Sequence, residues 1–478
     1  MTAAAPPGLP AKMHALVRTF LTSPGAVEAA VAEFGSPAHL VFPQVFAENL
    51  EGLRGVLAAR VPGFRICYAH KVNQSRAFVL TAWAAGVGID VASAAELDSA
   101  LGAGFTPDRI EVTGPKGAEF VADLVERGVT INIDNPWELE RIAALTEPGA
   151  RVPVLVRVCG FAGTPVSRFG VPLARIDAVL KVLAAERERI EFRGFAFHLD
   201  SGEPAERVRA VESCLELTER AYAAGLTPSI LNIGGGFRQV FTADATAFDA
   251  YVHALRESLL GRGEPMTWGG NTFGFHLEDG AVHGTPVFHK YANTVDAARM
   301  LADLLDTGLE SHGGRGLAAV AAENLLEVWL EPGKSLVDHA GITVARVEFV
   351  KETADGSTLV NLDLSRDTVT PADQEVMVDP ILVPANGSAA ESANSGAVGV
   401  FLAGRLCLER DLITNHKVWL PRCPAPGDFL VFPNTAAYHM DLSAARASMH
   451  SVPPKLAVAQ QSGTFRVCRD VDYRHEVH

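Results

Sequence analysis

The sequence lacks the cysteine pairs and long apolar runs that mark many secreted, zinc-binding or membrane-spanning proteins. Its six cysteines are scattered, with no Cys-x-x-Cys pair among them, which argues against a disulfide framework and a zinc site. No segment has the ~18 consecutive apolar residues that a membrane span requires. The N-terminal segment 2–7 has no apolar stretch of the signal-peptide kind. We therefore expect a soluble, cytoplasmic protein.

The chain also lacks an excess of basic residues. Lys and Arg total 41 against 56 Asp and Glu, for a formal net charge of -15, whereas a nucleic-acid partner favours a basic face. The hydrophobic fraction of 48% is typical of a globular protein with a large core. A length of 478 residues is compatible with two or three domains. We therefore expect a globular protein of several domains that does not bind nucleic acid.

Between about residues 46 and 340, strand-like stretches alternate with amphipathic segments rich in Ala and Leu. The predicted strands are Phe64–Cys67, Gly88–Val91, Ile110–Val112, Thr130–Ile133, Val152–Val158, Glu191–Phe197 and Ile230–Ile233. This alternation indicates an α/β fold with a parallel sheet. The number of repeats, with chemistry placed after strand ends, favours a closed (β/α) barrel. An open, doubly wound sheet is the alternative, although such sheets usually have fewer units.

The flanking segments follow other patterns. Residues 1–25 are expected to form a flexible head, and residues 38–42 predict a strand after the turn at 35–37. After about residue 340, strand-like stretches follow one another without long helices. We predict a β-rich domain made of residues 26–45 and 341–478, with a small, polar loop near 385–396.

Lys71 follows the first predicted barrel strand, in the segment Tyr68–Asn73. An amine at a strand end that opens into a pocket can trap a carbonyl carbon. Taken alone, Lys71 is more simply explained as one of the many exposed lysines of a protein surface.

Two further motifs also follow predicted strands. His198 ends an apolar run and offers a flat ring, although a buried structural histidine is the alternative. Gly234-Gly235-Gly236 exposes backbone N–H groups of the kind that bind phosphate, although a tight turn between a strand and a helix also uses glycines. Ser201, three residues past His198, adds a hydroxyl for the same anion.

Glu331, Cys407 and Tyr438 complete the set of candidates. An acid such as Glu331 at a strand end keeps a pyridine nitrogen protonated, and a protonated ring accepts carbanion electrons better; a turn or helix-cap carboxylate is the alternative. Cys407 lies among charged residues that favour a reactive thiol, or it is a small buried hydrophobe. Tyr438 either reaches a phosphate through its hydroxyl or packs. Together, the amine, ring, phosphate cradle and acid form the inventory that holds and tunes pyridoxal phosphate.

In their order along the chain, these motifs resemble those of the ornithine/diaminopimelate/arginine decarboxylase family, the fold-type III pyridoxal phosphate enzymes. The resemblance covers most of the chain and rests on Phe34–Pro37, Tyr68–Asn73, Asp90–Leu97, Ser167–Gly170, His198–Ser201, Gly234–Phe237, Glu331–Gly333, Cys407 and Tyr438. It implies an alanine racemase-like (β/α)8 TIM barrel over residues 46–340, with an insertion around 240–325, and a C-terminal β-rich domain.

The resemblance also implies roles for single residues. Lys71 would bond to the cofactor aldehyde, His198 would stack on the ring, and Glu331 would pair with the ring nitrogen. The remaining cofactor contacts would come from Asp90, Ser201, Gly235, Gly236, Lys334 and Tyr438. Arg168 and Glu409 are expected to contact an amino-acid substrate. The Cys407 loop would reach into the neighbouring subunit's site, which implies a homodimer with shared active sites.

Three departures from the family pattern bear on the substrate. Lys334 replaces the arginine of a Glu-Pro-Gly-Arg motif. A planar guanidinium that can donate two parallel hydrogen bonds is thereby replaced by a single ammonium charge. Leu408 stands where an acid usually holds a distal substrate amine, with Glu409 one place later. The segment that precedes Glu331 is also unusually long. We therefore expect an amino acid other than ornithine, lysine or diaminopimelate, either bulkier or differently substituted.

Three functions compete. The leading hypothesis is α-decarboxylation, with Cys407 or Lys71 returning a proton to Cα. A racemase or epimerase would use the same scaffold, but Glu331 counts against it because such sites pair the ring nitrogen with a cation. The third is a non-catalytic homologue that regulates a true decarboxylase; Lys71 favours cofactor binding, whereas the altered loop 404–411 keeps this reading open.

Overall fold

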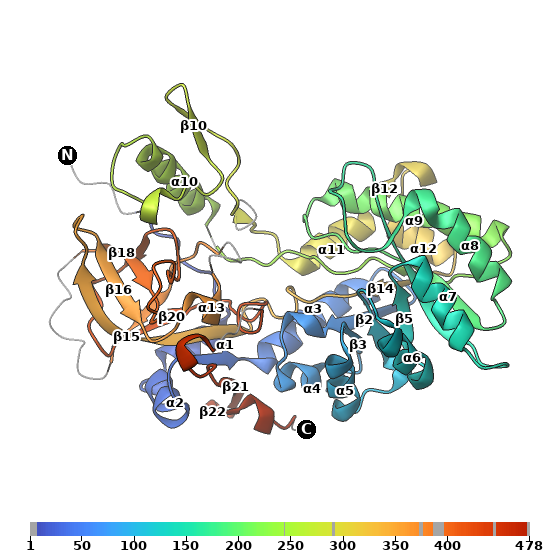
Figure 1. The fold of residues 1–478 in the computed structure, drawn as a ribbon, viewed down its shortest axis with the longest axis horizontal. Coiled ribbons are helices and arrows are strands. Elements are labelled where there is room, and N and C mark those ends of the chain that lie inside the picture. The colour runs from blue at the N-terminus through green and yellow to red at the C-terminus, as the bar shows by residue number, and fades with distance from the viewer. Residues whose placement is uncertain are drawn as a thin grey trace.

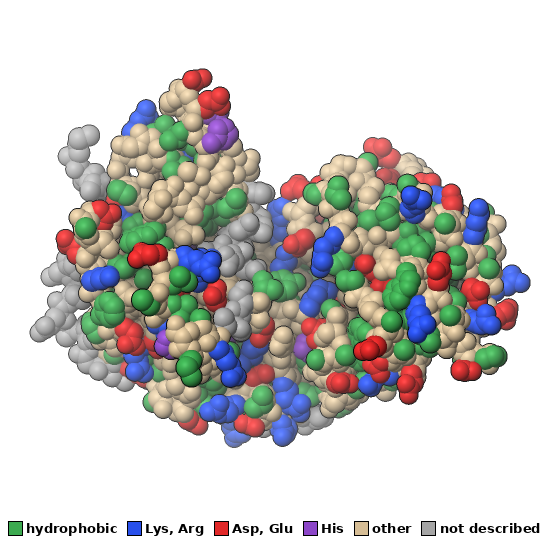
Figure 2. Space-filling view, in the orientation of Figure 1, with side chains coloured by type: hydrophobic (Ala, Val, Ile, Leu, Met, Phe, Trp, Pro, Cys, Tyr) green, Lys and Arg blue, Asp and Glu red, His purple; other side chains and the backbone are tan. Residues whose placement is uncertain are grey.

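A computed structural model describes residues 7–242, 244–288, 292–371, 376–385, 396–442 and 446–475. Figure 1 shows a barrel domain beside a β-rich domain, and a smaller lobe around α10 that rises from the β-rich side. No helix of the described residues is both long enough and apolar enough to cross a membrane. In Figure 2, Lys and Arg side chains are interspersed with Asp and Glu over the visible face of the barrel domain.

The barrel consists of eight parallel strands joined into a closed ring. Their order is β5-β4-β3-β2-β14-β9-β8-β6, and β5 pairs with β6 to close the ring. The strands are β2 (Phe64–Ala69), β3 (Gly88–Val91), β4 (Ile110–Val112), β5 (Thr130–Ile133), β6 (Val152–Cys159), β8 (Ile190–Ala196), β9 (Ile230–Asn232) and β14 (Glu327–Leu330). A two-residue strand, β7 (Val171–Pro172), is added beside β6. The closed barrel is confirmed, and the open doubly wound sheet is excluded.

Helices surround the barrel, and polar residues after three of its strands cap the helices that follow. Ser75, Ser93 and Asn135 each cap a helix by accepting a hydrogen bond from a backbone N–H in its first turn. The surrounding helices are α3 (Pro43–Ala58), α4 (Arg76–Ala84), α5 (Ala94–Ala103), α6 (Ala118–Arg127), α7 (Pro136–Leu145), α8 (Ile176–Ala185), α9 (Pro204–Ala223), α11 (Ala297–Asp306) and α12 (Leu317–Glu323).

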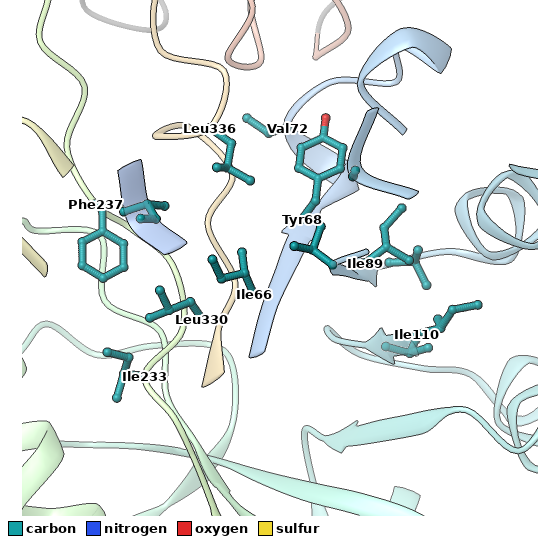
Figure 3. Packing of buried hydrophobic residues seen from close by; sticks show 14 of the residues in the cluster. Ile66, Tyr68, Val72, Ile89, Ile110, Ile233, Phe237, Leu330 and Leu336 are labelled. Atoms are coloured by element: carbon teal, nitrogen blue, oxygen red, sulfur yellow. The ribbon is translucent and has the colours of Figure 1, made fainter. Parts of the chain in front are cut away.

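The barrel core packs side chains of neighbouring strands against one another. Ile66 of β2 is the register partner of Leu330 of β14, and Figure 3 shows the two side chains beside each other. Tyr68, two residues further along β2, is fully buried and meets the ring of Phe46 on α3 edge-on, with centroids 4.9 Å apart. This packing fixes the end of β2, and therefore the position of the residues that follow it.

The second domain is a β-sheet built mainly from the C-terminal part of the chain. An early strand, β1 (Ala38–Val41), joins it by pairing antiparallel with β15 and parallel with β21. The other strands are β15 (Gly341–Glu352), β16 (Thr358–Leu362), β17 (Ile381–Val383), β18 (Val398–Ala403), β19 (Val418–Leu420), β20 (Phe429–Phe432), β21 (Lys455–Gln461) and β22 (Thr464–Arg469). A short helix, α13 (Arg366–Val369), follows β16. Most of the polar loop predicted near 385–396 lies outside the described residues.

The N-terminal segment differs from the flexible head expected from its sequence. Residues 15–22 form α1 (Ala15–Thr22), whose Val17 and Phe20 are buried. The Phe20 ring meets those of Phe42 and Phe465 edge-on, at centroid distances of 5.7 and 5.2 Å. A second helix, α2 (Ala26–Phe34), precedes β1. Contacts with a strand more than 400 residues away in sequence hold α1 in place, and local sequence patterns do not reveal such contacts.

The long segment between β9 and β14 has two separate parts. Its first part contains α10 (Ala245–Leu259) and the hairpin β10 (His276–Glu278)–β11 (Ala281–His283), and shares a hydrophobic core with Leu9 and residues 376–378. Its second part contains α11 and α12, with the strand pair β12 (Gly308–Leu309) and β13 (Arg315–Gly316) between them, and α11 packs on α3. Figures 1 and 2 show the first part as a lobe separated from the barrel by a notch.

Candidate active site

Lys71 lies in a single 3-10 turn, His70–Val72, that begins where β2 ends. Its Nζ donates a hydrogen bond of 2.8 Å to Oδ2 of Asp90, which is fully buried on β3. Burial lowers the pKa of Lys71, but the charges of Asp90 and Glu331 outweigh this effect and raise it above the usual value. The other carboxylate oxygen, Oδ1 of Asp90, is buried without a partner among the described residues.

Four barrel strands each carry a buried polar residue flanked by two apolar neighbours. These residues are Asp90 on β3, Glu111 on β4, Asn132 on β5 and Asn232 on β9. Asp90 and Glu111 are direct register partners. Asn132 and Asn232 both donate to Oε1 of Glu111, at 3.0 and 2.9 Å. The barrel interior therefore contains a connected polar layer.

Glu331 follows β14 directly and is hydrogen-bonded to this layer. Its Oε1 accepts hydrogen bonds from Asn232 at 2.7 Å and from Asn132 at 3.4 Å. Burial raises the pKa of Glu331, Asp90 raises it further, and Lys71 and Arg157 oppose the shift. Burial likewise raises the pKa of Glu111 well above its usual value, and the charges of Glu331 and Asp90 add to that effect. The hydrogen bond between the two carboxyl groups adds to the raised pKa of Glu111 and lowers that of Glu331, so it favours the proton on Glu111 and the charge on Glu331.

His198 follows β8 and faces the glycine loop, which is made of residues 234–236 after β9. Its Nδ1 accepts a hydrogen bond of 3.3 Å from the N–H of Gly235. Burial, together with the positive charges of Lys71 and Arg157, lowers the pKa of His198 well below its usual value. The imidazole is therefore neutral at physiological pH.

The glycine loop after β9 is closely packed. A Cβ at Gly235 would collide with the carbonyl oxygen of Glu331, and one at Gly236 would collide with that of Leu199. Gly236 also has a φ of 77°, which disfavours other residues. The N–H of Gly236 makes no hydrogen bond to a described residue, and is therefore free to bind an anion.

Three other predicted cofactor residues lie around this loop. Ser201 is exposed and donates to Oε2 of Glu206 at 2.6 Å. Lys334 forms an ion pair with Asp200. Tyr438 comes from the β-rich domain, and its N–H donates to the carbonyl of Val72, next to Lys71, at 2.9 Å. The C-terminal part of the chain thus borders the site.

Cys407, Glu409 and Arg168 do not contact Lys71, Asp90 or Glu331 within one chain. Cys407 and Glu409 are exposed on the loop that follows β18, and Figure 1 shows β18 on the side of the β-rich domain away from the barrel. Asp411 anchors this loop by accepting a hydrogen bond of 2.7 Å from the N–H of Leu406. Arg168 is exposed in the segment after β6 and stacks on Phe169, 4.3 Å from the ring centroid.

Sequence reasoning missed five residues of this region: Glu111, Asn132, Arg157, Arg207 and Asn232. For four of them a signal was available, because each is a single polar residue between two apolar residues of a predicted barrel strand. That pattern places Glu111, Asn132, Arg157 and Asn232 inside the barrel together with Asp90. Arg207 lies in a charged helical segment, where an arginine gives no such signal.

The site fits pyridoxal phosphate on the chemistry of its groups. Lys71 supplies an amine, the neutral ring of His198 supplies a flat packing surface, and the Glu331 carboxylate supplies a partner for a protonated ring nitrogen. The Gly236 N–H and the unpartnered Asp90 oxygen leave polar groups available to a ligand.

Comparisons with known proteins agree with this chemistry. Residues 54–267 match the family model described as the pyridoxal binding domain of pyridoxal-dependent decarboxylases. The chain is 32% identical over 462 residues to protein y4yA of Sinorhizobium fredii, described as uncharacterized, covering 95% of both chains. It is 23% identical over 442 residues to the diaminopimelate decarboxylase of Pseudomonas aeruginosa, covering 88% of both chains. The fold is similar to that of the diaminopimelate decarboxylase of M. jannaschii in complex with L-lysine, with a TM-score of 0.69, 19% identity and coverage of 93% of this chain and 91% of that one.

Proposed function

The chain belongs to the family of pyridoxal-dependent amino-acid decarboxylases, and from that premise we propose that it removes the α-carboxylate of an amino acid other than ornithine, lysine or diaminopimelate. The observation that carries the proposal is the position of Glu331. This carboxylate is buried at the end of β14, held at 2.7 Å by Asn232, and shares the barrel interior with Lys71 and Asp90. An acid at this place suits decarboxylation, which releases an electron pair that must be accepted nearby.

Pyridoxal phosphate, when bound, supplies a ring that accepts the electron pair released as the carboxylate leaves. Lys71 would bond to its aldehyde, His198 would pack on its ring, and Glu331 would face the ring nitrogen. The phosphate would meet Gly235, Gly236, Ser201, Lys334 and Tyr438. Asp90 holds the Lys71 amine in place at 2.8 Å.

The Glu111–Glu331 pair explains how the acid keeps its charge. Two buried carboxyl groups in contact cannot both ionise without a large cost. The hydrogen bond between the two groups raises the pKa of Glu111 and lowers that of Glu331, and Asn232 donates to both, so the arrangement favours the charge on Glu331. A carboxylate that accepts these hydrogen bonds is a weaker base, so a proton on the ring nitrogen of a bound cofactor would stay on the ring.

Two groups of this chain are suited to return a proton to Cα. Lys71 lies at the site, and its amine would be available there once a substrate amine had taken its place on the cofactor. Cys407 is exposed on the loop that follows β18, and Figure 1 shows that strand on the side of the β-rich domain away from the barrel. We therefore place Cys407 at the active site of a second copy of the chain, in a homodimer with shared sites.

The loop after β18 supports the choice of substrate. Leu408 follows Cys407 directly and is 47% exposed. An apolar side chain there cannot pair with a distal ammonium group, as an acid would. Glu409 is one residue further on and also exposed. We expect a substrate whose distal end is bulkier, or carries its polar group elsewhere, than in the simple diamino acids.

A racemase would use the same scaffold but is less well supported. Racemisation benefits from a weaker electron sink, such as a ring nitrogen paired with a cation. Here the buried group is the Glu331 carboxylate, fixed by two asparagine amides. Decarboxylation is therefore the better-supported reaction.

The experiment that tests this function measures carbon dioxide release. The purified protein, supplied with pyridoxal phosphate, is incubated with a broad panel of D- and L-amino acids. We expect release from at least one member, abolished in Lys71→Ala and kept in Lys351→Ala, which alters an exposed lysine of β15. Loss of optical activity without carbon dioxide would instead identify a racemase. Absence of any turnover would favour a regulatory role.

A further inference from the structure

Arg207 is a buried arginine in the first turn of α9, beside the glycine loop. Its side chain is 1% exposed and packs over the ring of Phe237, with Cζ 4.6 Å from the centroid. Its hydrogen bonds go to backbone carbonyls: Nη2 donates to Leu199 at 2.8 Å and to Gly235, and Nη1 donates to Ile233 at 3.4 Å. In the part of the chain that the structure describes, no carboxylate pairs with this guanidinium.

A buried cation without a counter-ion is costly and therefore needs an explanation. Desolvation disfavours the charged form, and burial lowers the pKa of Arg207 to about 10. The guanidinium nevertheless remains protonated at physiological pH. Its Nε is buried without a partner among the described residues. The charge of Asp200 partly offsets the effect of burial on this pKa, but Asp200 forms its ion pair with Lys334. The fold thus retains a buried positive charge that has no ion-pair partner among the described residues.

The three carbonyl contacts join two separate loops. Leu199 lies between His198 and Ser201, whereas Ile233 and Gly235 belong to the loop after β9. Because a trans peptide points its C=O and N–H in opposite directions, a donor on the Gly235 carbonyl directs the Gly236 N–H away from Arg207. In the same way, the hydrogen bond from Arg207 to the Leu199 carbonyl directs the Asp200 N–H away from Arg207. Neither N–H makes a hydrogen bond to a described residue.

Lys334 does not supply the same charge. It replaces the family's arginine, and its Nζ is engaged by the carboxylate of Asp200, which is 56% exposed. An ammonium already paired with an acid contributes less net positive potential to an anion. Arg207 feels the charge of Asp200 but forms no ion pair with it, and its guanidinium therefore supplies positive charge that Lys334 does not.

We propose that Arg207 is a positioning residue of the phosphate site: it ties the two loops together, aims the N–H groups of Asp200 and Gly236 at the cofactor phosphate, and adds positive charge behind them. The inference deepens the proposed function and rests on it. Arg207 is expected to affect binding of the phosphate dianion. Binding of the rest of the cofactor should not depend on Arg207.

The test compares pyridoxal phosphate with pyridoxal, which lacks the phosphate. Apo-protein is prepared with hydroxylamine, and both affinities are measured from absorbance titrations for the wild type, Arg207→Met, Arg207→Lys and Arg209→Met. Arg209 lies on the same helix, and among the described residues its side chain donates to the carbonyl of Ala162 alone. We expect Arg207→Met to bind pyridoxal phosphate about tenfold to a hundredfold more weakly, with pyridoxal affinity unchanged. The affinity of Arg207→Lys for pyridoxal phosphate should lie between those of the wild type and Arg207→Met. Arg209→Met should bind both ligands as the wild type does.

The outcomes separate this inference from the proposed function. If the wild type binds pyridoxal phosphate and Arg207→Met binds it equally well, the inference is overturned and the function stands. Equal weakening for both ligands would also overturn it, because it would indicate a purely structural role. If Arg207→Met does not fold, Arg207→Lys provides the test. The inference requires that this variant lose part of the wild-type preference for pyridoxal phosphate over pyridoxal. A wild type that binds neither ligand overturns the proposed function, and the inference with it.

Discussion

Asn232 donates a hydrogen bond of 2.7 Å to the carboxylate of Glu331, inside a closed parallel barrel. The same amide nitrogen also donates to Glu111, and the side-chain oxygen Oδ1 of Asn232 accepts from the N–H of Gly234 at 2.8 Å. One side chain therefore fixes the acid of the site and the start of the glycine loop. This contact links the position of Glu331 to that of the phosphate loop.

Asn232→Ala should destabilise the protein and slow catalysis. The change removes one hydrogen bond from each of the two buried carboxyl groups and leaves the N–H of Gly234 without a partner, and an unsatisfied buried group costs about 1–3 kcal/mol. Urea unfolding measures the loss of stability, and carbon dioxide release measures activity. Asn324→Ala, which alters an exposed asparagine bonded to Val320, serves as the control. Unchanged stability in Asn232→Ala would show that the carboxyl groups do not depend on this amide.

Glu111→Gln should change how stability depends on pH. The folded pKa of Glu111 is raised above the unfolded value, so its protonated form is favoured on folding. Its contribution to stability is therefore complete below about pH 4.3 and is lost as pH rises toward the folded pKa, by about 1.4 kcal/mol per pH unit. Glutamine does not titrate. We expect the free energy of unfolding of Glu111→Gln, relative to the wild type, to rise with pH over that window in urea titrations of the apo-protein. A difference that is constant with pH would mean that Glu111 is ionised in the folded state.

Leu408→Glu should shift substrate preference toward diamino acids. It restores an acid directly after Cys407, where it can pair with a distal ammonium group. We expect kcat/KM for lysine or ornithine, relative to the native substrate, to rise about tenfold, which corresponds to 1.4 kcal/mol. Leu277→Glu, on the exposed hairpin strand β10, is the control. If both variants keep the wild-type preference, the residue after Cys407 does not face the substrate.

Mixing Lys71→Ala with Cys407→Ala should restore activity. If each site combines Lys71 of one subunit with Cys407 of another, a mixed dimer contains one intact site. Random exchange of subunits then recovers roughly a quarter of wild-type activity. The measurement is carbon dioxide release before and after exchange at a fixed total concentration. Activity that does not rise on mixing would contradict shared sites.

The sequence was sufficient to predict the barrel because its strands and helices alternate regularly and each strand is short and apolar. The Lys71 turn, His198 and the glycine loop were also predictable, since each comes directly after a predicted strand. A single polar residue between apolar neighbours also marks the inside of a barrel strand, and Glu111 shows how informative that pattern is.

The remaining features depend on contacts that are distant along the chain. Phe20 is buried because it meets Phe465, and α11 covers the barrel although a separate lobe precedes it in sequence. Arg207 lies in a charged helical segment that reads as an exposed helix, and its burial depends on carbonyls of two loops. The place of Cys407 relative to Lys71 depends on how copies of the chain assemble.

The most direct test of the account is the identity of the residue that bonds to the cofactor. The protein is loaded with pyridoxal phosphate, reduced with borohydride, digested and analysed by mass spectrometry. We predict that the reduced cofactor is attached to Lys71, and that Lys71→Ala takes up no label. Attachment at a different lysine, or no attachment after cofactor has been supplied, would contradict the account.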